Sequence, residues 1–178
     1  EIPLRLVGSE MCIRDRASGE DLVPERVMLR LVPLLKRYFD RVILDSPAGV
    51  GRGFRAAAAA ADCALIVCNS DPVCIRDASI VRRLLTELEV PQQRLVINRF
   101  NAEYFGSLSA GREDAGGLRD LDDVIDQSGV RLIGIVPEDR QMTAAFQRGC
   151  VPADGLPGMT ALSRIAARMN GVSVPLSL

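Results

Sequence analysis

Short apolar runs alternate along this chain with longer segments whose apolar residues recur at helical spacing. Buried strands read as continuous apolar runs, whereas surface helices carry an apolar stripe, so the pattern predicts both kinds of element. Strands are predicted at residues 42–44, 64–68, 94–98 and 131–136. Helices are predicted at residues 22–38, 52–61, 76–89, about 120–127, about 140–148 and 159–169. Strands separated by helices form right-handed βαβ units, so we expect an α/β fold with a parallel sheet covered on both faces.

The helix at residues 76–89 has the clearest amphipathic pattern. Ile80, Leu84, Leu85 and Leu88 recur at helical spacing and are predicted to share its apolar face. This face would pack against the sheet.

Polar residues follow each predicted strand. They are Asp45, Asn69 to Asp71, Asn98 with Arg99, and Pro137 with Glu138 and Asp139. Ligands of open parallel sheets bind beyond the carboxyl ends of the strands, so these residues are the candidate site.

Asp45 is the candidate metal ligand. It ends the strand in the run R-V-I-L-D-S-P-A-G, and a carboxylate in this position can hold Mg²⁺ through a water while the metal bridges nucleotide phosphates. The alternative is an aspartate that caps the turn before Pro47. Gly49, Gly51 and Gly53 follow, but the dinucleotide fingerprint would need a glycine where Phe54 stands.

Asn98 and the segment Pro137, Glu138 and Asp139 are the candidates for contact with a nucleotide base. A side-chain amide offers one donor and one acceptor, which matches the edge of adenine. The alternatives are turn chemistry for Asn98, and a turn followed by a helix N-cap for the other three residues.

The amino-acid composition excludes several kinds of catalysis and ligand binding. The chain of 178 residues has no histidine, which excludes catalysis and metal binding by histidine, and its formal net charge of −1 predicts no nucleic-acid partner. Lys36 is the only lysine and lies in a predicted helix. A phosphate-binding loop of the form G-x-x-x-x-G-K-[ST] is therefore absent from this sequence.

The five cysteines, Cys12, Cys63, Cys68, Cys74 and Cys150, show no C-x-x-C spacing. Cys63 and Cys68 flank one strand and are five residues apart, so the pleat places them on opposite faces. We expect buried, reduced thiols rather than a metal site.

Five motifs, taken in order, resemble the MinD branch of the MinD/ParA family of deviant P-loop ATPases. They are I-L-D-S-P-A-G at 43–49, V-C-I-R-D at 73–77, V-I-N-R-F-N at 96–101, G-I-V-P-E-D at 134–139 and Q-R-G-C-V-P at 147–152. The likeness implies a three-layer parallel sheet of the P-loop NTPase type that lacks the N-terminal P-loop strand. Residues 17–171 would form the C-terminal two-thirds of such a domain, and residues 172–178 a tail. Residues 1–16 resemble a translated sequencing adaptor.

The resemblance also implies a function. Family members bind and hydrolyse ATP with Mg²⁺, form ATP-dependent homodimers, and cycle between the cytoplasm and the inner membrane to position the division septum. Asp45 would match the Walker B aspartate on the Mg²⁺ side. Asn98, Arg99, Pro137, Glu138 and Asp139 would match the adenine-side residues. Arg76 and Asp77 would match the start of a helix that docks division-site regulators.

The sequence departs from the family pattern at several positions. Both lysines of the P-loop and the switch aspartate that follows are missing, so we expect this chain alone to be inactive. Gly51 replaces an acidic residue, and Ser79 stands where a second docking aspartate is common. The tail has no basic amphipathic helix, so membrane contact would require one to be restored. The alternatives are a flagellar-placement or partitioning ATPase of the same fold, and a non-hydrolysing α/β binding module.

Overall fold

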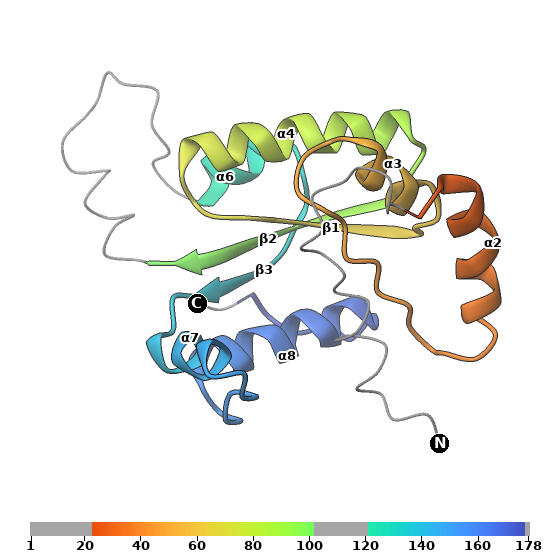
Figure 1. The fold of residues 1–178 in the computed structure, drawn as a ribbon. Helices are drawn as coiled ribbons and strands as arrows, with labels where there is room; N and C mark the ends of the chain where they lie inside the picture. Colours follow the sequence, from red (N-terminus) through yellow and green to blue (C-terminus); the bar gives the residue numbers. More distant parts are fainter. Residues whose placement is uncertain (1–22, 102–120, 177–178) are drawn as a thin grey trace. The chain divides into compact units, whose positions relative to one another are not determined.

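The computed structural model describes residues 23–101 and 121–176, and the chain divides into two compact units (Figure 1). The first unit comprises residues 1–60 and the second residues 61–178. The adaptor-like residues 1–16 lie outside the described residues.

In its described residues, 23–60, the first unit has helices α2 (Glu25–Leu35) and α3 (Arg52–Ala59), which pack against each other. Val32 of α2 and two alanines of α3, Ala56 and Ala58, are buried. Both helices were predicted, and both are shorter than the predicted ranges at one or both ends.

The predicted strand at residues 42–44 is wrong. The segment that joins α2 to α3 is neither strand nor helix, and the side chain of Ile43 is 91% exposed. A strand exists only where its backbone groups pair with a neighbouring strand. Three apolar residues cannot form a ladder alone, and no described residue pairs with them.

The second unit is built on a parallel sheet with the strand order β1-β2-β3. These strands are β1 (Cys63–Cys68), β2 (Gln92–Phe100) and β3 (Leu132–Pro137), and they confirm the other three predicted strands. β1 pairs with β2 in unbroken register from Cys63 opposite Gln92 to Cys68 opposite Ile97. β2 therefore continues past the end of β1.

Helices cover both faces of this sheet, which gives three layers (Figure 1). One face carries α4 (Pro72–Glu87) and α6 (Leu121–Ser128), and the other carries α7 (Arg140–Gln147) and α8 (Pro157–Met169). Leu95 and Ile97 of β2, Ile75 of α4 and Val124 of α6 are fully buried. The predicted α/β architecture is confirmed for this unit.

Helix α4 begins four residues earlier than the predicted start. Asp71 occupies the N-cap, where its carboxylate accepts a hydrogen bond of 2.9 Å from the backbone N–H of Cys74, and Pro72 is the first helical residue. An aspartate followed by proline is a start signal that the apolar pattern does not contain. The predicted apolar face is also wrong at Ile80, which is 38% exposed, because the buried positions of α4 are Ile75, Ala78 and Leu85.

Helix α8 approaches β3 closely because Gly134 has no side chain. A Cβ added at Gly134 would lie 2.2 Å from Cγ1 of Ile165 and 2.7 Å from its Cδ1. Ile165 fills this space and joins a buried cluster with Val96, Ile133, Val136 and Ala161.

The register between β2 and β3 shifts at the same place. Leu95 pairs with Leu132 and Val96 pairs with Gly134, so Ile133 is an extra residue on β3. Such a bulge interrupts the ladder of hydrogen bonds. Arg168 of α8 donates a hydrogen bond of 2.7 Å to the Ile133 carbonyl. The same guanidinium donates to the carbonyls of Val174 and Pro175, which holds the chain that follows α8.

We predict that Gly134→Ala destabilises the second unit. The added methyl group must displace the buried, β-branched Ile165, and overpacking of this kind costs about 1–3 kcal/mol. Urea unfolding followed by circular dichroism measures the loss. In an Ile165→Ala background the added methyl group keeps only an ordinary contact of 3.4 Å with Nη1 of Arg168, so a double-mutant cycle should give a coupling of about 1 kcal/mol or more. Equal costs in both backgrounds would contradict the proposed contact.

Candidate functional site

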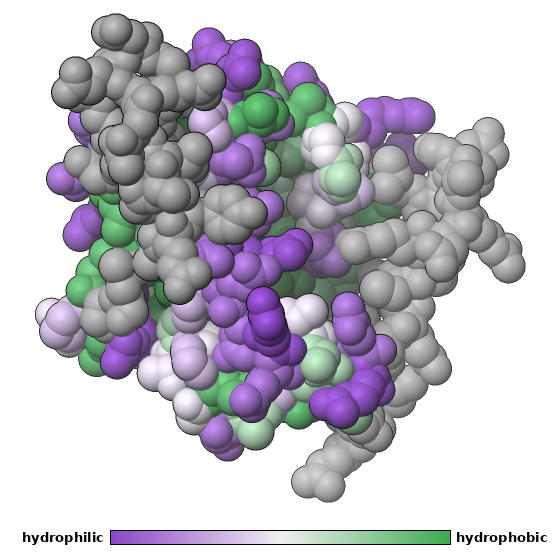
Figure 2. Space-filling view, turned by 90° about the vertical axis from the view of Figure 1, so that its left-hand side faces the viewer, coloured by the Kyte–Doolittle hydropathy of each residue, from purple (hydrophilic) through white to green (hydrophobic). Residues whose placement is uncertain are grey.

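The carboxyl ends of β2 and β3 lie side by side at one edge of the sheet. Phe100 pairs with Pro137, and the backbone N–H of Glu138 donates a hydrogen bond of 2.9 Å to the Phe100 carbonyl. Figure 2 views the molecule from the side toward which these strands run, and hydrophilic residues occupy the middle of that face. Four of the predicted adenine-side residues, Asn98, Arg99, Pro137 and Glu138, belong to these two strand ends.

A second register shift shapes the end of β2. Between the pairs Ile97–Ile135 and Phe100–Pro137, β2 has two residues, Asn98 and Arg99, whereas β3 has one. Arg99 adopts a φ of 53°, in the left-handed region, which costs a residue with a side chain about 1–2 kcal/mol. Bulges with such backbone recur beside functional sites, where they redirect side chains.

Asn98 is half-buried at this bulge. Its side-chain amide makes no hydrogen bond to another residue of the described ranges, although most buried polar groups have a partner. The amide is therefore available to a ligand with both a donor and an acceptor.

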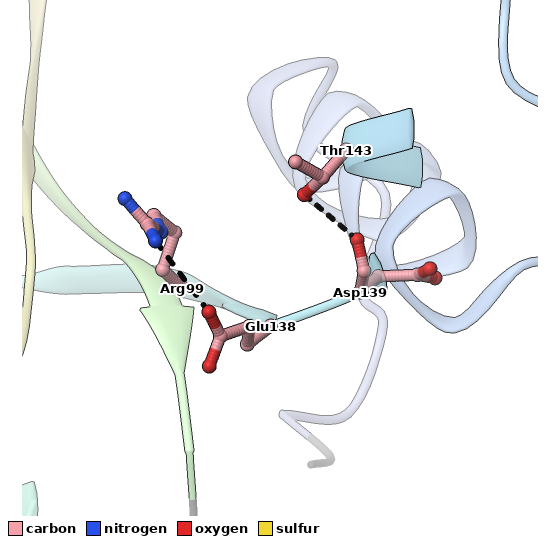
Figure 3. A network of polar contacts seen from close by, with 4 residues as sticks. All are labelled: Arg99, Glu138, Asp139 and Thr143. Carbon is pink, nitrogen blue, oxygen red and sulfur yellow. Dashed lines mark hydrogen bonds and ion pairs between the residues drawn. The ribbon is translucent and has the colours of Figure 1, made fainter. Parts of the chain in front are cut away.

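Arg99 and Glu138 form an ion pair that joins the two strand ends (Figure 3). Nη2 of Arg99 lies 3.5 Å from Oε1 of Glu138, and the side chains are 68% and 44% exposed. Exposed pairs contribute about 0–1 kcal/mol, so this pair orients side chains rather than stabilises the fold.

Asp139 points the other way from Glu138, toward the helices (Figure 3). Its Oδ1 accepts hydrogen bonds of 2.9 Å from the backbone N–H groups of Gln141 and Met142, and its Oδ2 accepts one of 3.3 Å from Gly158. Asp139 is therefore the N-cap of α7, which confirms the alternative interpretation of this residue. The side chain is occupied by these contacts and does not face the strand ends.

The same hydrogen bonds set the charge state of Asp139. The backbone N–H of Met142, with those of Gly158 and Gln141, lowers the pKa of the carboxyl below its ordinary value and outweighs the opposing effect of burial. A lowered folded-state pKa means that the stabilisation is present above the ordinary carboxyl pKa and is lost as pH falls through the folded value. Asp139 therefore stabilises the fold at neutral pH.

Asp45 belongs to the first unit, in the exposed segment between α2 and α3. The D-S-P-A-G turn ends at Gly49, whose φ of 81° requires glycine. Among the described residues, no group of three or more acidic or sulfur side chains could hold a metal. Mg²⁺ often uses one or two carboxylates, with water and substrate phosphates as its other ligands, so an exposed aspartate fits this role only together with a nucleotide.

Arg76 and Asp77, the predicted partner contacts, lie in the first half of α4 and are both exposed. Val73, one turn earlier, is 58% exposed. Ser79 donates a hydrogen bond of 2.7 Å to the Arg76 carbonyl, which is a contact within the helix. The arrangement leaves these side chains accessible to a second protein.

The four described cysteines are free thiols, but they are not all buried. Cys63, Cys68 and Cys74 are half-buried and Cys150 is exposed, so the prediction of buried thiols is wrong for Cys150. Burial, together with the nearby Cys74 and Asp71, raises the pKa of the Cys68 thiol to about 11. A hydrogen bond between the side chains of Cys74 and Asp71 raises the pKa of the Cys74 thiol and lowers the pKa of the Asp71 carboxyl.

No family model matches the chain. The septum site-determining protein MinD of Synechocystis sp. is 32% identical over 161 residues, which are 88% of this chain and 57% of that protein. MinD of Bacillus subtilis is 31% identical over 160 residues, 88% of this chain and 56% of that protein. In the MinC:MinD complex of Aquifex aeolicus, a chain superposes with a TM-score of 0.77 at 30% identity, covering 89% of this chain and 63% of that chain.

The chain is MinD-like. A MinD from Pyrococcus horikoshii, solved with Mg-ADP, shares the fold, with a TM-score of 0.65 at 22% identity over 82% of this chain and 56% of that chain. The predicted fold class, a parallel α/β sheet of the P-loop NTPase type, is thus confirmed, and no strand precedes β1 in the part of the chain that the structure describes. The MinD-like chain spans less than two-thirds of the length of each relative named here.

These relatives all carry the MinD name, which favours the MinD branch over the flagellar-placement and partitioning ATPases. Two features of the site were not predicted from the sequence. The left-handed backbone at Arg99 has no sequence signal, whereas Pro157 followed by Gly158 marks the start of α8, where Asp139 makes its third hydrogen bond.

We predict that the thiols of the folded chain react in an order set by their surroundings. At about pH 8, a pKa of about 11 leaves roughly one Cys68 in a thousand as thiolate, which is the reactive form. Alkylation, followed at each site by peptide mass spectrometry, should therefore be at least about tenfold faster at the exposed Cys150. Denaturant should remove the difference. Equal rates in the folded chain would show that Cys68 is not shielded.

Proposed function

We propose that this chain is part of a MinD-like ATPase that acts in the spatial regulation of cell division, at the placement of the septum. The observation that carries the proposal is the likeness to septum site-determining proteins over 88% of the chain. The geometry of the carboxyl edge agrees with a nucleotide site there, because ligands of such sheets bind beyond the strand ends.

Adenine of ATP is the proposed occupant at the ends of β2 and β3. The amide of Asn98 can donate to one edge atom of the base and accept from another. The base would be bordered by Pro137 and by the ion-paired Arg99 and Glu138. The backbone of Asp139 would form the end of this proposed base-binding segment. The Mg-ADP complex of the Pyrococcus horikoshii protein supports an adenine nucleotide as a ligand of this fold.

Asp45 is proposed to hold Mg²⁺ through a water molecule. When bound, the metal would neutralise charge on the phosphates. The chain has no G-x-x-x-x-G-K-[ST] loop to cradle those phosphates, and its one lysine, Lys36, follows α2. We therefore expect no ATP turnover by the 178 residues alone.

The proposed partners are a second copy in an ATP-dependent homodimer and a division-site regulator. The Aquifex aeolicus complex pairs a MinD with MinC, and the exposed Arg76 and Asp77 of α4 are the proposed contacts with such a regulator. No described helix is long and apolar enough to span a bilayer. We propose a cytoplasmic protein whose membrane contact, if any, is peripheral.

We predict that ATP binds this chain weakly and by its base. Without phosphate contacts, the dissociation constant should be on the order of 1 mM or weaker. In amide NMR spectra, ATP with Mg²⁺ should shift the signals of Asn98 and Glu138 more than GTP does. Asn98→Ala should remove this preference, because the adenine edge loses its partner.

The matched control is Asn170→Ala, the same substitution at the end of α8. It should leave the ATP-induced shifts unchanged. Equal shifts with ATP and GTP, or none at about 10 mM ATP, would contradict adenine recognition at this edge. Phosphate release that Asp45→Asn abolishes would contradict the expected lack of turnover.

We predict that a MinC protein binds the chain through α4. Asp77→Arg reverses a charge at the proposed interface and should weaken binding about tenfold. Binding of the Aquifex aeolicus MinC, measured by biolayer interferometry, tests this change. Asp126→Arg, a charge reversal at an exposed position of α6, is the control and should have no effect. A variant Asp77→Arg that binds like the wild type would exclude this surface.

A further inference from the structure

Helix α8 begins without a capping side chain of its own. Leu156 occupies its N-cap position and makes no side-chain hydrogen bond there, and Pro157 is the first helical residue. The first turn of a helix has N–H groups that need acceptors from outside the helix. Gly158 donates its N–H to Oδ2 of Asp139, which lies nineteen residues earlier.

Asp139 also begins α7. Its Oδ1 accepts from the N–H groups of Gln141 and Met142, and its carbonyl oxygen accepts from the N–H and the hydroxyl of Thr143. One residue, 8% exposed, therefore supplies acceptors to the first turns of two helices.

The packing around this carboxylate is close. A Cβ at Gly158 would lie 2.7 Å from the sulfur of Met142 and 3.4 Å from the Cβ of Asp139. The starts of α7 and α8 are thus in direct contact, and a side chain at position 158 would require the end of Met142 to move.

The residue before Asp139 is attached to the sheet. Glu138 donates its N–H to the Phe100 carbonyl and pairs with Arg99 through its side chain. Figure 3 shows that Glu138 faces Arg99, whereas Asp139 faces the helices. The peptide between them is therefore held from both sides.

We propose that Asp139 is a positioning residue that sets the backbone course of Pro137 and Glu138 by tying the end of β3 to α7 and α8. The inference rests on the proposed function in one respect, the assignment of Pro137 and Glu138 to the nucleotide base. The side chain of Asp139 touches no ligand, because it faces the helices. Its carboxylate acts through the two residues that precede it.

Hydrogen exchange tests the proposal without any nucleotide. The Glu138 amide reports on the end of β3, and the Leu95 amide, bonded to the Arg131 carbonyl in the core, reports on the sheet as a whole. Asp139→Ala should accelerate exchange at Glu138 about tenfold more than at Leu95, because the opening is local. Asp139→Asn keeps one acceptor oxygen and should have a smaller effect, and it provides the measurement should the alanine variant fail to fold.

The matched control is Asp71→Ala. Asp71 is also an aspartate N-cap, but its side chain accepts from the backbone N–H of Cys74 in the helix that it begins, α4. Asp71→Ala should leave the ratio of the Glu138 and Leu95 exchange rates unchanged, although it lowers the stability of the fold by the loss of one helix cap. Equal acceleration of both amides in Asp139→Ala would overturn the proposal and leave Asp139 as a general stabiliser.

ATP-induced shifts separate this proposal from the proposed function. Asp139→Ala should weaken the affinity for ATP, measured from the shifts at Asn98 and Glu138, about tenfold, whereas Asn170→Ala should not. Absence of shifts in the wild-type chain would contradict adenine binding and leave the exchange result to decide the role of Asp139. Shifts that persist undiminished in Asp139→Ala would overturn the positioning role and leave adenine binding intact.

Discussion

The second unit depends on how closely α8 approaches the edge strand β3. Gly134 removes the side chain that would keep them apart, and Ile165 fills the space with buried apolar contact. The same approach brings Arg168 to the Ile133 carbonyl, which the bulge leaves outside the regular ladder. Dense apolar packing and satisfaction of a buried carbonyl therefore occur at one contact, and both need the short distance that Gly134 permits.

The position of α8 is fixed at its other end by charge. Asp139 accepts hydrogen bonds from the starts of α7 and α8, where the helix dipoles favour a negative group. Because Asp139 directly follows the candidate base-binding segment, the order of that segment is coupled to the packing of the helices. The exposed pair of Arg99 and Glu138 adds orientation at the strand ends but little stability.

The sequence predicted the elements of the second unit well because their signals are local. The apolar runs of β1, β2 and β3 and the helical period of α8 arise from neighbouring residues, and each was found within a few positions. The run at 42–44 failed because a strand also needs a partner, which a local pattern cannot provide. The bulge at Arg99 depends on the register of β2 against β3, a relation between residues almost forty positions apart. For Asp139, an N-cap signal was visible, whereas its bond to Gly158 required the fold.

The two halves of the proposed nucleotide site have different physical requirements. Phosphate chemistry needs concentrated positive charge and backbone donors, which a G-x-x-x-x-G-K-[ST] loop provides, and this sequence has no such loop. Base recognition needs a few polar groups held in fixed directions. At the carboxyl edge, the hydrogen bond from Glu138 to Phe100 and the contacts of Asp139 are made entirely within the second unit. The shape of the part proposed to bind the base is thus maintained by contacts within the second unit. It does not depend on residues that would bind phosphate, so either part of the site can be lost without the other.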